Sequence, residues 1–296
     1  MASPADAVIS VSSHVARGGV GNRAMVFALE RLGFEVWAVP TILLPHHPGH
    51  GPVEKIVPDE KGFEALLERL IEGGRGADVG GIVSGYLASA AQARAVAKLV
   101  RAVKAARPDA VYLCDPVIGD LDRLYVAEAL AETIRDELLP LADIATPNAF
   151  ELRWLAGSTQ AESDLAPLAR KLRPPEVLVT SAPSLMRGQV GNLLVDEADT
   201  ILFEHSLLST PVKGTGDLLA ALLLARRLEG HAWPKAVEKA LSSVFEIVAG
   251  SAKAGADELM LAELQTSLVQ PHAPIGVRRI GNAPGMPRGE PNSNES

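Results

Sequence analysis

Short runs rich in Val and Ile alternate along most of the chain with longer segments of helical periodicity, and this alternation limits the fold more than any other feature. The apolar runs predict strands at residues 7–12, 35–41, 79–84, 110–115, 143–146 and 176–180. The segments between them predict helices near residues 20–32, 60–73, 89–106, 123–139 and 163–172. This order predicts an α/β fold with a mainly parallel central sheet, helices on both faces and a ligand site at the carboxyl ends of the strands.

The alternation changes after residue 180. The stretch VGNLLVDEADTILFEH predicts a hairpin of two strands around residues 196–199, so antiparallel strands should join the sheet toward the C-terminal half. Two further helices are predicted near residues 215–229 and 233–250.

From residue 271 on, the chain is rich in Pro, Gly, Asn and Ser and poor in large apolar residues. Such a composition buries too little apolar surface to offset the entropy of ordering, and it predicts disorder. Residues 5–265 contain no internal repeat and no linker. We therefore predict a single domain over residues 1–265 and a disordered tail over residues 266–296.

Charge and cysteine content exclude several classes of partner. The net charge of −8 gives no basic surface for nucleic acid or for an anionic membrane. The N-terminus lacks the basic and apolar regions of a signal peptide, and the longest apolar run, Leu218–Ala225, is far shorter than the roughly 20 residues that span a bilayer. The only cysteine, Cys114, has no partner within the chain, which suits a reducing compartment. These features predict a cytoplasmic protein.

The stretch GVGNRA, residues 19–24, fits the G-x-G-x-x-A pattern of a dinucleotide-binding turn. That pattern also requires an acidic residue at the end of the next strand to hold the ribose, and residues 35–41 end without one. A tight glycine turn before a helix is therefore the favoured interpretation. The P-loop pattern G-x-x-x-x-G-K-[ST] is absent from the sequence.

A second glycine motif, KGTGDLLAALLLA, is more informative. Gly214 and Gly216 let the backbone turn sharply and bring consecutive N–H groups to the positive end of the following helix, where a phosphoryl group fits. Asp217 falls within the first helical turn. Its spacing alone fits a helix cap and a catalytic carboxylate about equally well.

Acidic residues also follow two predicted strands. CDPVIGD places Asp115 and Asp120 at the end of a buried strand, and TPNAFEL places Asn148 and Glu151 at the end of the next strand and the start of a helix. Carboxylates at two neighbouring strand ends could hold a hydrated Mg²⁺ beside the phosphates of ATP.

Taken in order, the motifs SSHVARGGVGN, SGYLAS, CDPVIGD, TPNAFEL and GTGDLLAALLLA resemble those of pyridoxal kinases in the ribokinase-like superfamily. The resemblance covers nearly all of residues 7–250. GTGD alone would indicate only the superfamily, which also phosphorylates sugars, nucleosides and hydroxymethylpyrimidine. The N-terminal motif, SGYL, and VWAVPT followed by a loop with histidines indicate the pyridoxal branch.

The resemblance implies a role for each matching residue. It implies that Ser13, His47 and Tyr86 contact the vitamin and that Asp217 is the base that deprotonates the substrate alcohol. The residues that would form the anion hole are Gly214, Thr215 and Gly216. The residues that would face ATP are Asp115, Thr146, Asn148, Glu151, Thr180 and Lys213. Asp115 and Glu151 would also contact Mg²⁺, and the family pattern leaves room for a monovalent cation.

The loop LLPHHPGHG departs from the family pattern. Pro45, His46 and Pro48 stand where small polar residues are more frequent, and Arg17 stands where an aromatic is frequent. A Pro- and Gly-broken loop does not place His46, His47 and His50 on one helical face, so a substrate-covering loop is favoured over a zinc site. Thr180 stands where some relatives carry Lys, and Lys213 could supply that cation instead.

The function that the resemblance implies is ATP-dependent phosphorylation of the 5′-hydroxymethyl group of pyridoxal, and also of pyridoxine or pyridoxamine, in vitamin B6 salvage by a homodimer. One alternative is a related kinase for hydroxymethylpyrimidine or a sugar. Another is a non-catalytic vitamin-binding protein on the same fold, because fold alone does not fix function.

Overall fold

The computed structural model describes residues 6–158 and 164–282. Its strands are β1 (Ala7–Val15), β2 (Glu35–Leu44), β3 (Val79–Ser84), β4 (Val111–Cys114), β5 (Gly119–Asp120), β6 (Arg123–Leu124), β7 (Ile144–Ala145), β8 (Glu176–Ala182), β9 (Gln189–Val195), β10 (Asp199–Ser206) and β11 (Gly276–Asn282). Its α-helices are α1 (Asn22–Arg31), α2 (Glu60–Leu70), α3 (Ala90–Ala106), α4 (Glu128–Thr133), α5 (Ala149–Leu155), α6 (Leu165–Lys171), α7 (Thr215–Leu228), α8 (Trp233–Lys253) and α9 (Thr266–Val269). None of the helices in these two ranges is long and apolar enough to cross a membrane.

Nine strands form one sheet in the order β11-β10-β9-β8-β7-β4-β3-β1-β2. Every pair from β2 to β8 is parallel, and β9, β10 and β11 are added antiparallel beyond β8. The predicted fold class is confirmed, including the hairpin after residue 180. Because β3, β4 and β7 are neighbours, their carboxyl ends bring distant segments of the chain together.

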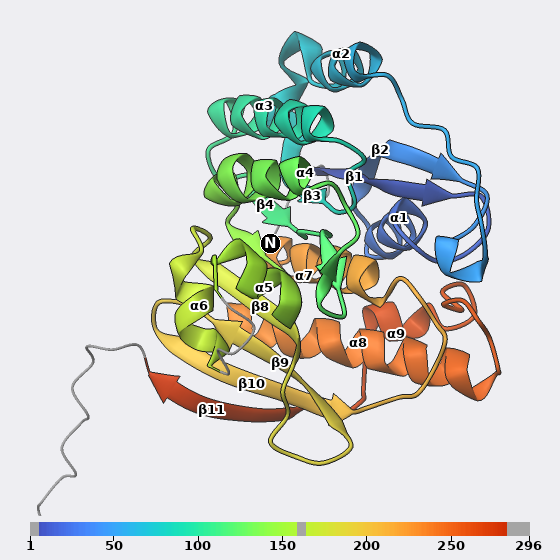
Figure 1. The fold of residues 1–296 in the computed structure, drawn as a ribbon, viewed down its shortest axis with the longest axis vertical. Helices are drawn as coiled ribbons and strands as arrows, with labels where there is room; N and C mark the ends of the chain where they lie inside the picture. Colours follow the sequence, from blue (N-terminus) through green and yellow to red (C-terminus); the bar gives the residue numbers. More distant parts are fainter. Residues whose placement is uncertain (1–5, 159–163, 283–296) are drawn as a thin grey trace, which may run out of the picture.

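The helices cover both faces of the sheet, as Figure 1 shows. One face carries α1, α7 and α8, and the other carries α2, α3 and α4. Helices α5 and α6 pack with β8 and β9 in a third apolar cluster on that second face. The parallel strands are therefore apolar on both sides, which explains why their sequences read as continuous runs rather than as alternating patterns.

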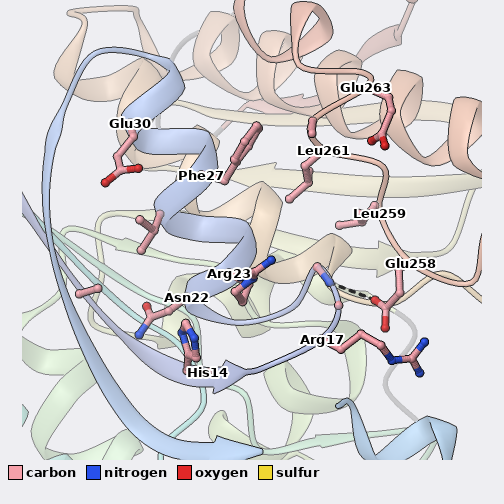
Figure 2. Close-up of a pocket in the computed structure, with 15 residues that line it drawn as sticks. His14, Arg17, Asn22, Arg23, Phe27, Glu30, Glu258, Leu259, Leu261 and Glu263 are labelled. Atoms are coloured by element: carbon pink, nitrogen blue, oxygen red, sulfur yellow. Dashed lines mark hydrogen bonds between the residues drawn. The ribbon is translucent and has the colours of Figure 1, made fainter. Parts of the chain in front are cut away.

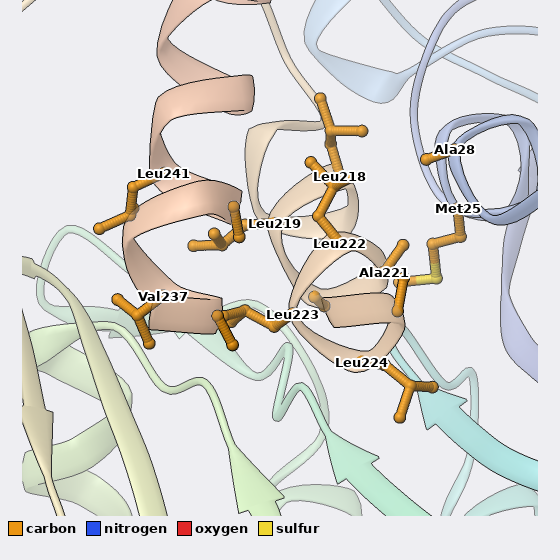
Figure 3. Packing of buried hydrophobic residues seen from close by; sticks show 14 of the residues in the cluster. Met25, Ala28, Leu218, Leu219, Ala221, Leu222, Leu223, Leu224, Val237 and Leu241 are labelled. Carbon is orange, nitrogen blue, oxygen red and sulfur yellow. The ribbon is translucent and has the colours of Figure 1, made fainter. Parts of the chain in front are cut away.

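Helix α7 is buried on all sides rather than on one stripe. Every residue of Leu218–Ala225 is buried, between α1 and α8 and over β3 and β4 (Figure 3). A helix that is apolar all round belongs in the interior, and burying a leucine there contributes on the order of 2 kcal/mol. The first turn of α7, which carries Asp217, is thus anchored by the core.

The predicted helix over residues 123–139 begins too early. Residues 119–124 instead form the β5–β6 hairpin, and its two turn residues, Leu121 and Asp122, have φ of 48° and 66°. Two consecutive left-handed residues are typical of the tightest hairpin turns, which usually use Asn-Gly or Asp-Gly. The sequence Leu-Asp carries no such signal, so the hairpin could not be recognised from the sequence.

The predicted disorder of residues 266–296, and with it the boundary at residue 265, is wrong for the residues up to 282. Leu268 of α9 is fully buried, and β11 pairs with β10. Arg279 also donates to Asp199 at 3.0 Å. Main-chain pairing and ion pairs order this segment without the apolar content that the prediction required. Residues 283–296 lie outside the described part of the chain.

Truncation should therefore have two distinct outcomes. A chain that stops after residue 275 loses β11 and leaves the edge of β10 unpaired, so we expect its Tm to fall by a few degrees and its aggregation to increase. A chain that stops after residue 282 is the control and should melt like the full chain. Thermal unfolding and light scattering measure both effects. Equal Tm values for the two truncations would contradict a stabilising role for β11.

Candidate active site

The candidate catalytic residues gather at the carboxyl ends of the parallel strands, opposite the N-terminus of α7. Asp115 directly follows β4, and Thr146 directly follows β7. The remaining strand-end residues are Ser13 near the end of β1, Tyr86 after β3 and Thr180 in β8. The backbone N–H of Thr180 donates to the carbonyl of Pro147 at 2.9 Å, which ties the ends of β7 and β8 together.

Asp217 is the third residue of α7 and is partly exposed at the mouth of this site. Its carboxylate accepts a hydrogen bond from the backbone N–H of Gly21. Burial raises the pKa of Asp217 to about 6, and the bond from Gly21 opposes that rise. A carboxyl group with this pKa is mostly ionised at neutral pH and accepts a proton more readily than an ordinary aspartate.

The anion-binding turn is held in shape by a close backbone contact. Gly214 caps α7 with φ of 87°, and a Cβ atom there would lie 2.2 Å from the carbonyl oxygen of Gly19. Only glycine fits this position. Thr215 and Gly216 follow as the first two residues of α7, so their N–H groups have no acceptor within the helix. Donors of this kind at the positive end of a helix bind phosphate.

Asp115 lies beside this turn. A Cβ atom on Gly216 would be 4.0 Å from Oδ2 of Asp115, and Thr146 Oγ1 donates to Oδ1 at 2.8 Å. The side chain is buried, with 8% of the residue exposed. Burial, followed by the negative charge of Asp217, raises the pKa of Asp115 to about 7. The hydrogen-bond donors of the site therefore do not compensate all of the negative charge of its carboxylates.

Glu151 adds to this charge, but its oxygens are already occupied. Oε1 accepts from the N–H groups of Ile118 and Gly119, and Oε2 accepts from the N–H of Asn148. Burial, followed by the charge of Asp115, raises the pKa of Glu151 to about 8. Glu151 thus acts on the site mainly through its charge and through the segment that it holds in place.

Asn148 forms the other half of a capping box at the start of α5. Its side-chain oxygen accepts from the N–H groups of Phe150 and Glu151, and its amide donates to the carbonyl of Gly119 at 2.8 Å. These bonds use the side chain to join α5 to the β5–β6 hairpin. The structure thus gives Asn148 a scaffold role, and its predicted contact with ATP stays a prediction.

Asp120, which the sequence placed beside Asp115, is instead exposed on β5. Tyr125, which the sequence analysis missed, follows the same hairpin, and its N–H donates to the carbonyl of Ile118. Burial, followed by the charges of Glu151 and Asp115, raises the pKa of Tyr125 well above its usual range. The phenol therefore lies close to Asp115, Glu151 and Asp217, here called the acidic cluster. No motif in the sequence could have indicated this, because the hairpin itself was not recognisable.

The residues predicted on the vitamin side are Ser13, His47 and Tyr86, and fewer contacts connect them to the acidic residues. Ser13 approaches Gly21 so closely that a Cβ atom there would lie 2.5 Å from the Ser13 hydroxyl. Tyr86 is half-buried, and its carbonyl accepts from the hydroxyl of Thr41 on β2 at 2.7 Å. Burial, and then the charge of Lys213, lower the pKa of His47, so its imidazole is neutral at pH 7.

The loop of residues 45–51, here called the histidine loop, contains one turn of 3₁₀ helix, Pro48–His50. The described residues contain no group of three or more His, Cys, Asp or Glu side chains that could hold a metal ion. The preference for a substrate-covering loop over a zinc site stays a prediction. Lys213 is exposed and lies near His47. Its predicted contact with ATP stays a prediction.

A pocket of about 640 Å³ lies on the other side of the turn formed by residues 18–21, here called the glycine turn (Figure 2). Its walls come from α1, including Arg23 and Phe27, and from residues 258–263 after α8. Arg17 lines it too, and its N–H donates to the carbonyl of Pro45 at 3.0 Å. Gly18 and Gly19 of the glycine turn thus line the pocket, while Gly21 of the same turn donates to Asp217.

Comparisons with known proteins show which family this chain is similar to. A family model described as phosphomethylpyrimidine kinase matches residues 38–261. The protein named pyridoxal kinase PdxY from Leifsonia xyli subsp. xyli is 37% identical over 93% of this chain and 99% of its own length. The PdxY of Granulibacter bethesdensis is 35% identical over 89% of this chain and 96% of its own length.

Among solved structures, pyridoxal kinase from Leishmania donovani in complex with ADP and pyridoxine has a TM-score of 0.85 and 28% identity. The match covers 93% of this chain and 99% of that one. The sheet, the anion-binding turn at the start of α7 and these matches define the class of protein, a small-molecule kinase of the ribokinase-like fold. Within that class, the chain belongs to the pyridoxal kinase family.

Proposed function

We propose that the protein transfers the γ-phosphoryl group of ATP to the 5′-hydroxymethyl group of pyridoxal, and of pyridoxine or pyridoxamine. The observation that carries this proposal is the position of Asp217. Its carboxylate lies next to the N–H groups that begin α7 and close to Asp115, so a base, an anion site and a metal-binding acid meet at one point. Phosphoryl transfer needs this combination of positioning and charge stabilisation more than it needs covalent chemistry.

In this mechanism Asp217 accepts the proton of the substrate hydroxyl as the hydroxyl oxygen attacks the γ-phosphorus. The bond from that phosphorus to the β,γ-bridging oxygen breaks, and ADP leaves. The N–H groups of Thr215 and Gly216 donate to the oxygens of the transferred phosphoryl group, where negative charge is concentrated. The hydrogen bond from Gly21 keeps the Asp217 carboxylate in its orientation. The buried helix beneath it keeps the base and the anion site at a fixed separation.

The acidic cluster fits a magnesium ion in the chemistry of its donors. Mg²⁺ takes oxygen ligands and is held in kinases by one or two carboxylates together with phosphate oxygens. Asp115 would hold the ion, since Thr146 occupies only one of its two oxygens, and the charge of Glu151 would add to the attraction. When bound, the ion would neutralise phosphate charge. A monovalent cation, a homodimer and a cytoplasmic location stay predictions.

The side chains of Ser13, His47 and Tyr86 would bind the vitamin. His47 presents a neutral ring, whose Nδ1 accepts from the N–H of Gly49 at 3.0 Å. Its Nε2 therefore carries a proton, and it would donate to a polar substituent of the pyridine ring. Thr180 and Lys213 would contact the nucleotide phosphates.

Substitutions on the vitamin side should separate the two substrates. We expect His47→Ala and Tyr86→Ala to raise the KM for pyridoxal by about 10-fold, since each loses a hydrogen bond or an aromatic contact, while the KM for ATP changes by less than about threefold. Steady-state kinetics with each substrate varied in turn measure this difference. His46→Ala serves as the control within the same loop. Equal effects on both KM values would remove the two residues from the vitamin site.

The proposed reaction is tested by measuring ATP consumption with pyridoxal, pyridoxine, pyridoxamine, hydroxymethylpyrimidine and a panel of sugars. Pyridoxal should give the highest kcat/KM, and mass spectrometry should find the phosphate on the 5′ oxygen. The family model described as phosphomethylpyrimidine kinase supports a second candidate, the phosphorylation of hydroxymethylpyrimidine. A higher kcat/KM for that alcohol than for pyridoxal would establish it instead.

A further inference from the structure

A single carboxylate joins three segments that are far apart in the sequence. Glu258 Oε2 accepts from the backbone N–H of Gly19 at 3.1 Å, and Glu258 Oε1 lies 3.0 Å from Nε2 of His50, whose N–H donates to it. The side chain is mostly buried, with 16% exposed, and that of His50 is 19% exposed. Glu258 thus connects the glycine turn to the histidine loop, and Figure 2 shows it beside that turn.

The geometry of this contact is fixed both by the glycine turn and by the segment that carries Glu258. Gly18 has φ of 116°, and a Cβ atom there would lie 2.5 Å from Oε1 of Glu258, so the backbone approaches the carboxylate in a way that only glycine allows. The segment that carries Glu258 is itself fixed, since Leu259 and Leu261 are buried in the core and Ser251 Oγ accepts from the N–H of Met260. A charged, largely buried acceptor on a fixed segment makes a strong hydrogen bond.

Both segments that Glu258 holds reach into the candidate active site. From the glycine turn, the carbonyl of Gly19 packs against Gly214, and the N–H of Gly21 donates to Asp217. From the histidine loop, His47 lies near Lys213, the residue before Gly214. Glu258 therefore binds two segments that border the site. Its Oε1 accepts from the histidine loop, on the vitamin side, and its Oε2 accepts from the glycine turn, beside the phosphate site.

We infer that Glu258 is a positioning residue, which closes the histidine loop against the glycine turn and thereby places His47 over the bound vitamin. This role rests on the proposed function, because it assigns the loop to the alcohol substrate. In this role Glu258 would touch neither substrate. Its effect passes through His50 to the vitamin and through Gly19 to the turn.

The inference is tested with Glu258→Ala, with Glu263→Ala as the matched control. Glu263 lies on the same segment and lines the same pocket, but it is exposed, and Figure 2 shows it apart from the glycine turn. Loss of a charged hydrogen bond should raise the KM for pyridoxal by about 10-fold or more and leave the KM for ATP within about threefold. The control should show wild-type values for both.

Hydrogen exchange gives a second measurement that does not depend on activity. In Glu258→Ala, the amides of Gly19 and of the histidine loop should exchange faster, while those of the buried helix α7 should not. His50→Ala removes the histidine end of the contact, together with the approach of its Nδ1 to Asp257 Oδ2 at 3.9 Å and its ring contact with His47, and it alters a surface loop rather than the core. It should raise the KM for pyridoxal to the same extent, and the double variant should add no further effect.

Additive effects of the two substitutions, or a Glu258→Ala variant with wild-type exchange and wild-type KM, would overturn the inference. So would equal increases in both KM values together with a lowered Tm, because that pattern indicates a general loss of structure. If Glu258→Ala does not fold, His50→Ala carries the test alone through the KM for pyridoxal. A wild-type enzyme that does not phosphorylate pyridoxal refutes the proposed function instead, and hydrogen exchange still tests the contact.

Discussion

Replacing Asp217 with Asn should lower kcat for pyridoxal by on the order of 10² or more, the usual contribution of a positioned general base. Asn keeps the shape of Asp and an oxygen that can accept from the N–H of Gly21, but it cannot take the proton of the alcohol. The two residues cap helices about equally well, so folding should be retained. Steady-state kinetics and thermal unfolding of the same sample measure both properties.

The control for this prediction is Asp59→Asn. Asp59 caps α2 with a bond from the N–H of Gly62 and lies far along the chain from the site. A loss of activity there would show that capping, rather than proton transfer, controls kcat. If Asp217→Asn kept near-normal kcat or unfolded the protein, Asp217 would be only a cap.

The pH dependence offers a second measurement of the same role. Because the base must be ionised, kcat/KM should fall as the pH drops through about 6, the pKa of Asp217 in the folded protein. Activity should therefore be lost toward acid and kept above pH 7. The residual activity of Asp217→Asn should lose the part of this acid limb that belongs to the base, and protonation of Asp115, whose pKa is about 7, should account for the part that remains.

Replacing Asp115 with Asn should have opposite effects on activity and on stability. We expect kcat to fall by on the order of 10², because the proposed metal loses its main carboxylate. At pH 8 we expect Tm to rise by about 2 °C or more, because a buried negative charge is removed while the oxygen that accepts from Thr146 is kept. Differential scanning calorimetry over a range of pH measures the second effect.

The sign follows from the pKa of Asp115, which is raised from 3.8 to about 7. A carboxyl group with a raised folded-state pKa contributes stability while it is protonated and loses that contribution as the pH rises through the folded value. The difference in Tm between variant and wild type should therefore grow from about pH 4 to about pH 7 and level off above it. Mg²⁺ with ATP should raise Tm for the wild type more than for the variant.

Asp120→Asn is the matched control, since Asp120 is exposed five residues further along. Its Tm and kcat should be those of the wild type. A lower Tm for Asp115→Asn at pH 8 would mean that nearby groups already compensate the charge of the carboxylate in the folded protein. That result would argue against a cation-binding site at Asp115.

The order of elements could be predicted because each parallel strand carries its own signal. Runs such as VGGIVS are apolar on both faces, and this local property already specifies a strand buried between helix layers. The place of the site could also be predicted. Parallel strands share one carboxyl edge, so Asp115 and Thr146 had to meet once β4 and β7 were neighbours.

The features that escaped prediction depend on contacts between distant segments. The β5–β6 hairpin is held by Asn148 and Glu151 rather than by its own turn sequence, and β11 is held by pairing with β10. Glu258 is an ordinary acid in a polar stretch until the fold brings it to Gly19 and His50. Properties that belong to a pair of segments leave no local pattern in either one.

The complete burial of α7 has a consequence for how acceptor specificity can be altered. The base and the anion site are attached to the most protected helix of the protein, whereas His47 lies on a half-exposed loop at the periphery. Surface loops tolerate insertion and replacement far better than cores do. Exchanging residues 45–51 for the corresponding loop of another kinase should therefore redirect the enzyme to a new alcohol while the phosphoryl-transfer machinery is inherited unchanged.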